Sequence, residues 1–118
     1  MKVVKFSPCD VKTRKESTLF RKAWNLWGAR AQLDMVVEEC AELIKAVQKI
    51  KRGPSAHIDS SKRIELESQL ADEVVDVQIM CEQLLVMFPT LQYLIPKIRA
   101  SKLNRLESLV AEAEEKNK

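Results

Sequence analysis

Two short stretches of the chain place acidic residues at the same spacing inside otherwise apolar sequence. The first trio is Glu38, Glu39 and Glu42, and the second is Asp72, Glu73 and Asp76. Residues three or four apart lie on one face of a helix, so each trio shares a face if its stretch is helical. Two such helices packed against each other would bring up to six carboxylates into one pocket.

A group of carboxylates is costly to hold together in a folded protein. Two carboxylates about 6 Å apart repel by roughly 3 kcal/mol at an effective dielectric constant near 20. Several such pairs rival the roughly 5–15 kcal/mol net stability of a whole domain. The acids therefore point into water, take up protons, or share a divalent cation. We favour the cation, because the matched trios contain no interleaved lysine; a solvated acidic face is the alternative.

The chemistry of the donors indicates which cation the acids would bind. All candidate ligands are hard carboxylate oxygens, which favours Mg²⁺, or Mn²⁺, over Zn²⁺. A di-iron bundle is disfavoured, because it would need a Glu-x-x-His pair on the acidic face. Mg²⁺ commonly completes its coordination shell with substrate phosphates. The pattern therefore suits metal-dependent phosphoryl chemistry on a nucleotide.

Further side chains are candidates for contacts to such a nucleotide. Lys102 and Arg105 lie three residues apart, on one helix face, and are natural phosphate contacts, although a solvated basic face has the same pattern. Phe20, Trp24 and Trp27 fall four and three residues apart, so they share another face. Their simplest role is packing. The sharper hypothesis is that a tryptophan, Trp27 in particular, stacks on the base.

The periodicity of apolar residues predicts an all-α fold, a bundle of about four helices. The expected elements are a helix from Ser17 that ends or kinks at Gly28, helices over 29–52 and 60–88, a turn or short helix over 90–95, and a last helix from Pro96. Residues 1–16 read as an arm or marginal strand before a domain over 17–118. The two long middle helices are apolar on more than one face, which suggests a core completed by a second subunit.

Composition narrows the class of protein. A chain of 118 residues suits one domain. It has no run of eighteen apolar residues and no signal-peptide pattern, which predicts a soluble, cytoplasmic protein without a membrane partner. Its three cysteines form no paired motif, so neither a disulfide framework nor a zinc ribbon is expected. Cys40 is expected to be a small core residue.

The net charge of +3 is unevenly distributed along the chain. Residues 1–30 contain eight basic and two acidic residues, whereas residues 64–88 contain six acidic residues and no basic one. A basic segment can attract nucleic acid. We favour a solubilising face that balances the acidic helix, so a nucleic-acid partner is not expected.

The acidic residues resemble the signature of a known family. Glu38-Glu39-Cys40-Ala41-Glu42, followed about thirty residues later by Glu73-Val74-Val75-Asp76, is similar to the EExxE…ExxD motif of the all-α nucleotide pyrophosphohydrolases, the MazG-like proteins. The similarity runs from about Trp27 through Gly53, resumes over 72–83 and ends over 102–106, so it covers roughly the last three-quarters of the chain. The element that contains Lys102 and Arg105 is the weaker part of this resemblance.

The resemblance implies Mg²⁺-dependent cleavage between the α and β phosphates of a nucleoside triphosphate, which yields a monophosphate and pyrophosphate. By position, the metal ligands would be Glu39, Glu42, Glu73 and Asp76. Glu38 would orient or deprotonate the attacking water, and Lys102 and Arg105 would hold the phosphates. The family also forms dimers or dimers of dimers, which implies a homodimer or homotetramer. The alternative function is a non-catalytic interaction module with a solvated acidic face.

Overall fold

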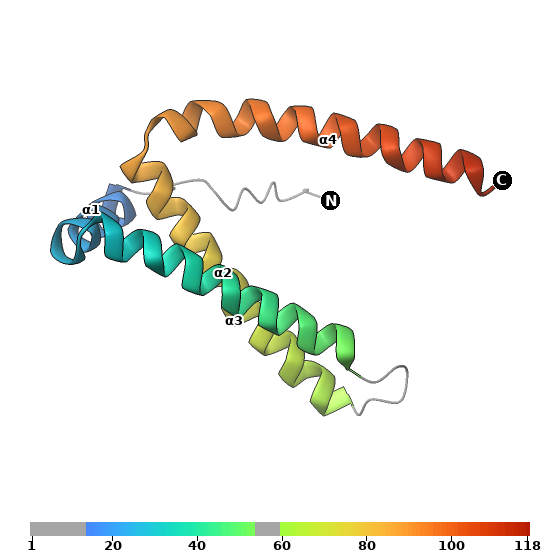
Figure 1. Cartoon of the computed structure of the whole chain (residues 1–118), viewed down its shortest axis with the longest axis horizontal. Helices are drawn as coiled ribbons and strands as arrows, with labels where there is room; N and C mark the ends of the chain where they lie inside the picture. Colours follow the sequence, from blue (N-terminus) through green and yellow to red (C-terminus); the bar gives the residue numbers. More distant parts are fainter. Residues whose placement is uncertain (1–13, 54–59) are drawn as a thin grey trace. The chain divides into compact units, whose positions relative to one another are not determined.

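The computed structural model describes residues 14–53 and 60–118, and within these ranges it is helical without any strand. The four helices are α1 (Arg14–Trp27), α2 (Ala29–Arg52), α3 (Ser60–Met87) and α4 (Thr90–Lys116) (Figure 1). The prediction of an all-α protein with about four helices is therefore confirmed. The predicted N-terminal arm lies outside the described residues, except for its last three residues, which belong to α1.

The chain forms two compact units, the first ending at Met87 and the second covering Phe88–Lys118. In the first unit, each of α1, α2 and α3 contacts the other two. Helices α2 and α3 lie side by side and run in opposite directions (Figure 1). The second unit consists of α4 with the two residues before it and the two residues after it. The acidic motifs both belong to the first unit.

Gly28 separates α1 from α2. Its φ of 89° and ψ of 155° lie in a region that only glycine adopts readily. The Gly28 amide still donates to the Trp24 carbonyl at 2.9 Å, and the Gly28 carbonyl accepts from the Gln32 amide at 3.1 Å. Gly28 therefore ends α1 and allows α2 to start at the next residue. At its other end α1 begins at Arg14, so Ser17 is not its N-cap.

The C-terminal helix differs from the prediction. The expected turn or short helix over 90–95 and a new helix from Pro96 are wrong, because α4 runs unbroken from Thr90 and contains Pro96. Pro89 already has helical φ and ψ (−58° and −24°), and the Gln92 amide donates to its carbonyl at 3.0 Å, so the helix is established before Pro96 is reached. The missing N–H of Pro96 removes one bond in the second turn, and the strong helix formers that follow continue the helix.

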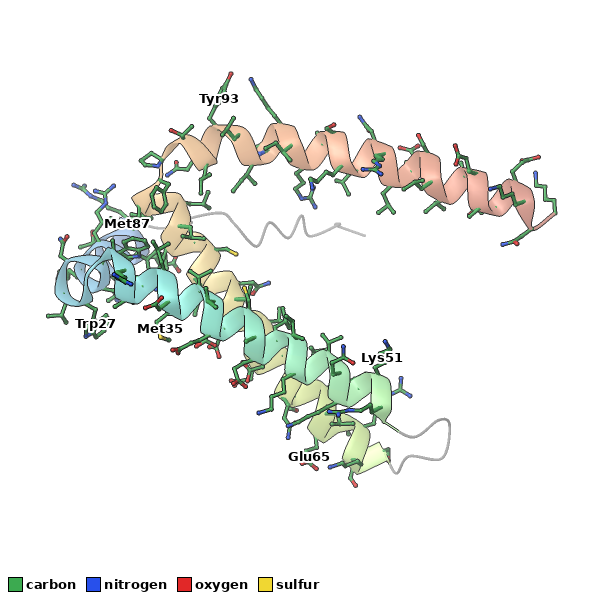
Figure 2. All side chains as sticks on the ribbon, viewed as in Figure 1. Trp27, Met35, Lys51, Glu65, Met87 and Tyr93 are labelled. Carbon is green, nitrogen blue, oxygen red and sulfur yellow. The ribbon has the colours of Figure 1, made fainter. Side chains whose placement is uncertain are left out.

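The buried apolar core of the first unit is small. Its members are Phe20, Trp24, Ala46, Met80, Leu85 and Val86. Trp27, by contrast, is 63% exposed at the end of α1 (Figure 2). Cys40 is also exposed, so its assignment to the core is wrong. The reason is that α2 has apolar residues on two faces, and only one of these faces packs against α3.

Among the described residues, no helix is both long and apolar enough to cross a membrane.

Candidate metal centre

Three carboxylates from two helices meet on the α2–α3 pair. One oxygen from each of Glu39, Glu73 and Asp76 lies within 4.8 Å of the other two. Glu39 belongs to α2, whereas Glu73 and Asp76 lie three residues apart on α3. All three side chains are half-buried. We refer to these residues as the acidic triad.

The antiparallel register of α2 and α3 explains how the triad forms. Gln32 of α2 is hydrogen-bonded to Gln83 of α3. Seven residues further along α2, Glu39 meets Asp76, which lies seven residues back along α3. Seven residues correspond to two helical turns, or about 10 Å. Equal steps in opposite directions thus bring together two acidic motifs that are about thirty residues apart in the sequence.

The triad raises the pKa of Glu39. The main cause is partial burial, followed by the negative charge of Asp76 and a hydrogen bond with that carboxyl group. The charges of Glu73 and Glu38 raise the pKa further. Glu39 therefore takes up a proton more readily than an isolated glutamate, which is the behaviour expected of carboxylates that share one site.

The pKa of Glu73 is raised for similar reasons. Partial burial is again the largest cause, and the charges of Asp76, Asp72 and Glu42 follow in that order. The positive charge of Lys49 acts in the opposite direction and lowers the pKa. Like charges therefore dominate around two members of the triad. A divalent cation between these oxygens would relieve the repulsion, and the purely carboxylate donor set fits Mg²⁺ or Mn²⁺.

The other predicted acidic residues lie around the triad. Glu38, Glu42 and Asp72 are all exposed. Glu42 lies close enough to Glu73 to raise the pKa of Glu73. Both residues line a small hollow on the α2–α3 pair. Glu38 and Asp72 act on the triad through their charge. The predicted pocket of six carboxylates is thus a group of three, with the other three at its edge.

The predicted phosphate contacts, Lys102 and Arg105, lie on α4 and therefore belong to the second unit. Both are exposed. Lys102 lines a hollow of about 380 Å³ whose other walls are mainly apolar, with Ile98 and Leu106 among them. Their contact with phosphate stays a prediction. On the same helix, the Lys97 ammonium lies 3.9 Å from the centre of the Tyr93 ring.

A buried polar network that the sequence analysis missed connects α1, α2 and α3. The Gln83 side-chain carbonyl accepts hydrogen bonds from the Trp24 indole and from the Gln32 amide, both at 3.0 Å. All three side chains are buried. The available sequence signal was a glutamine within the mainly apolar stretch 79–86, where a buried polar side chain needs an internal partner. The network fixes α3 against both other helices two turns from the triad.

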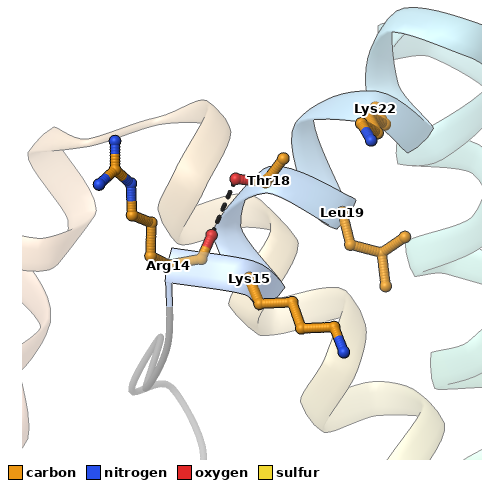
Figure 3. Close-up of a pocket in the computed structure, with 5 residues that line it drawn as sticks. All are labelled: Arg14, Lys15, Thr18, Leu19 and Lys22. Atoms are coloured by element: carbon orange, nitrogen blue, oxygen red, sulfur yellow. Dashed lines mark hydrogen bonds between the residues drawn. The ribbon is translucent and has the colours of Figure 1, made fainter.

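Part of the basic N-terminal segment gathers at a shallow hollow of about 460 Å³ on α1 (Figure 3). Its lining residues are Arg14, Lys15, Thr18, Leu19 and Lys22. The Thr18 hydroxyl donates to the Arg14 carbonyl at 2.9 Å. The described lining thus comes from one helix, and it contributes three cations and a single large apolar side chain.

No family model, characterised protein or solved structure matches this chain. The resemblance to the MazG-like proteins therefore stays a prediction that depends on sequence motifs, chiefly the acidic ones.

Proposed function

We propose that the chain is a Mg²⁺-dependent nucleoside triphosphate pyrophosphohydrolase. It would cleave an NTP or dNTP between the α and β phosphates and release a nucleoside monophosphate and pyrophosphate. The observation that carries this proposal is the acidic triad, whose oxygens come from two helices and lie within 4.8 Å of one another. The order and spacing of the EExxE…ExxD motif, to which all three residues belong, also support it.

The acidic residues divide into ligands and a residue that acts on water. In this proposal Glu39, Glu73 and Asp76 hold Mg²⁺ or Mn²⁺, and Glu42 is the fourth ligand beside them. When bound, the metal polarises the phosphate and lowers the pKa of a coordinated water. Glu38, exposed next to Glu39, orients the attacking water or accepts its proton.

The remaining roles belong to residues outside the triad. Lys102 and Arg105 of α4 are proposed as contacts to the substrate phosphates, as the resemblance implies. Trp27 stacks on the base; its exposed ring offers an apolar surface for this contact. An enzyme of this kind would act in the cytoplasm, where its nucleotide substrates are found.

We also propose that the chain is a homodimer or homotetramer. An exposed apolar stripe on α2 supports this part of the proposal, and with the small residue Cys40 included its members are spaced alternately four and three residues apart. Its large members are Leu33 (41% exposed), Val37 (68%), Ile44 (62%) and Val47 (47%). This spacing is that of helices which pack against a further helix along their length. A second chain would cover the stripe.

The alternative function is a helical interaction module without catalysis. The same exposed apolar stripe favours it, because large exposed patches mark sites of protein association. This alternative predicts that Mg²⁺ neither stabilises the chain nor supports hydrolysis.

The proposed reaction can be tested by following the products of a panel of canonical and modified NTPs and dNTPs by ³¹P NMR. The reactions are run with Mg²⁺, with Mn²⁺ and with EDTA. Pyrophosphate and monophosphate should form with either metal and not with EDTA. Release of orthophosphate would contradict cleavage between the α and β phosphates. Silence across the panel, together with no Mg²⁺-induced rise in Tm, would favour the interaction module.

A further inference from the structure

A small polar hollow of about 120 Å³ lies on the α2–α3 pair, directly beside the acidic triad. Its lining residues are Glu42, Lys45, Ala46 and Lys49 of α2, with Gln69 and Glu73 of α3. Glu73 also belongs to the triad, so the hollow and the triad share a wall. We call this feature the lysine hollow. The sequence motifs assign no role to it.

The lysine hollow has the functional groups of an anion site. Lys45 and Lys49 lie one turn apart on α2, and Gln69 lines the hollow from α3. The Lys49 ammonium is close enough to Glu73 to oppose the pKa-raising effect of the neighbouring acids. Within the described residues, no ion pair shorter than 4.0 Å joins either lysine to a carboxylate. Both ammonium groups can therefore donate to a ligand.

The size of the lysine hollow limits what it can receive. Pockets for nucleoside-sized or drug-sized ligands usually enclose about 300–1,000 Å³. The 120 Å³ of this hollow is too small for a base with its sugar and suits one or two phosphoryl groups. Its acidic wall, Glu42 and Glu73, would repel an isolated anion. A phosphate that shares a metal ion with these carboxylates avoids this repulsion.

We infer that the lysine hollow binds the β and γ phosphoryl groups of the substrate, through Lys45 and Lys49, and holds them as they leave as pyrophosphate. This inference rests on the proposed function. In that reaction a water oxygen bonds to the α phosphorus, and its proton passes through Glu38 to solvent. The bond from the α phosphorus to the α–β bridging oxygen breaks, and its electron pair leaves on pyrophosphate. Two ammonium groups beside that oxygen stabilise the new charge.

The inference also sets the direction of the substrate along α2 and α3. The lysine hollow lies on the side of the triad that faces the C-terminal end of α2. The Gln32–Gln83 contact lies on the opposite side, about 10 Å from the triad. The pyrophosphate end of the substrate would therefore point toward Lys49, and the nucleoside toward the end of the pair that contacts α1.

A competing explanation is that the two lysines only balance the charge of Glu42 and Glu73. In that case, removing a lysine makes the site more negative and strengthens Mg²⁺ binding, while pyrophosphate affinity does not change. Binding in the hollow predicts instead that removing either lysine weakens the binding of pyrophosphate. The two explanations can therefore be separated by measuring both ligands.

The test is a calorimetric titration of inorganic pyrophosphate into the full chain at saturating Mg²⁺, using Lys45→Ala, Lys49→Ala and Lys49→Arg. Lys51→Ala is the matched control, because Lys51 is an exposed lysine of α2 that does not line the hollow. Each alanine variant should bind pyrophosphate at least about tenfold more weakly, the loss expected for one hydrogen bond to a charged group. Lys51→Ala should stay within about twofold of the wild type, and Lys49→Arg should keep most of the affinity.

Nucleotide hydrolysis measured on the same samples separates the two proposals. If the wild type hydrolyses nucleotides and neither alanine variant weakens pyrophosphate binding, this inference is overturned and the proposed function stands. If pyrophosphate binds through the lysines but no nucleotide is hydrolysed, the proposed function fails and the anion site stands. If the wild type neither binds pyrophosphate nor hydrolyses nucleotides, both proposals are overturned.

Discussion

At the scale of single residues, the acidic triad makes the folded, metal-free chain less stable. Glu39 and Glu73 both have a raised pKa because each is partly buried beside other carboxylates. The free energy needed to keep them ionised at neutral pH is drawn from the stability of the folded chain. A bound cation would offset this cost in free energy. Replacing one of these carboxylates should therefore lower the rate of hydrolysis while it keeps or raises the Tm of the metal-free chain.

Replacing one triad carboxylate should abolish activity and leave the fold intact. Glu39→Gln or Asp76→Asn removes a proposed ligand, and the rate should fall by more than the roughly 10–100-fold that loss of an outer-sphere partner costs. In EDTA the same variants should melt at or above the temperature of the wild type, because repulsion is relieved. Pyrophosphate release and melting curves provide the two readouts.

Glu65→Gln is the control for these variants. Glu65 is an exposed acid of α3 in a surface ion pair of 3.7 Å with Lys62, which contributes little stability. Its rate should match the wild type. Full activity of Glu39→Gln would show that Glu39 does not belong to the proposed site.

The metal-free chain should lose stability as the pH rises above the ordinary carboxyl pKa of 4.5. Between this value and the raised pKa of the folded state, the folded chain binds more protons than the unfolded chain. The unfolding free energy contributed by Glu39 and Glu73 is therefore fully present below pH 4.5 and is lost as the pH passes through the folded pKa.

This pH dependence can be measured as the difference in Tm between the wild type and Glu39→Gln in EDTA from pH 4.5 to 8. The Tm of the wild type should fall relative to that of the variant over this range. Because Mg²⁺ competes with the bound protons, the rise in Tm on adding Mg²⁺ should be larger at pH 7.5 than at pH 5. A difference in Tm that is constant with pH would contradict the raised pKa values.

At the scale of helices, the antiparallel α2–α3 pair positions the triad, and the Trp24–Gln83–Gln32 network fixes its register. Gln83→Ala would remove the acceptor that the Trp24 indole and the Gln32 amide share. We expect a loss of about 2–6 kcal/mol in unfolding free energy, since removing the acceptor of a buried hydrogen bond costs about 1–3 kcal/mol for each of the two bonds. Urea denaturation measures this loss. Gln48→Ala, on the exposed face of α2, should change it by less than about 0.5 kcal/mol; equal effects would refute the network's role.

The two glycines of the chain offer a matched test of the α1–α2 junction. Gly28 has a φ of 89°, and a Cβ added there would meet no atom within 4 Å, so Gly28→Ala is penalised by backbone strain alone. That strain should cost about 1–3 kcal/mol. Gly53, with φ −56° and ψ 146°, is in a conformation that alanine adopts freely, so Gly53→Ala should be neutral or slightly stabilising. Equal stability of the two variants would contradict the observed conformation of Gly28.

The sequence predicts the helices well where local signals are strong. The bounds of α2 match the prediction, because a left-handed glycine precedes it and Gly53 follows it. Pro96 misled the prediction, since a proline early in a helix and a proline at its first position give similar patterns. The spacing of the acids indicated which of them share a face, but only the register between α2 and α3 determines that Glu39, Glu73 and Asp76 meet while Glu38 stays exposed.

At the scale of the whole molecule, the exposed apolar stripe on α2 should be covered by a second chain. Light scattering after size exclusion should give a mass of at least twice the 13.5 kDa of one chain. Ile44 is 62% exposed, so Ile44→Glu should lower the mass without disturbing the core. Gln48→Glu is the polar control on the same helix and should leave the mass unchanged. A wild type that stays monomeric at high concentration would contradict the proposed oligomer.

The most direct test of the metal centre is the binding of Mn²⁺ to the metal-free chain, followed by electron paramagnetic resonance. The signal of free Mn²⁺ should decrease when the wild type is added and recover when Mg²⁺ is added in excess. It should stay nearly unchanged when Glu39→Gln or Asp76→Asn is added, whereas Glu65→Gln should behave like the wild type. If the wild type leaves the free Mn²⁺ signal unchanged at millimolar protein, the triad holds no metal and the proposed metal-dependent hydrolysis is contradicted.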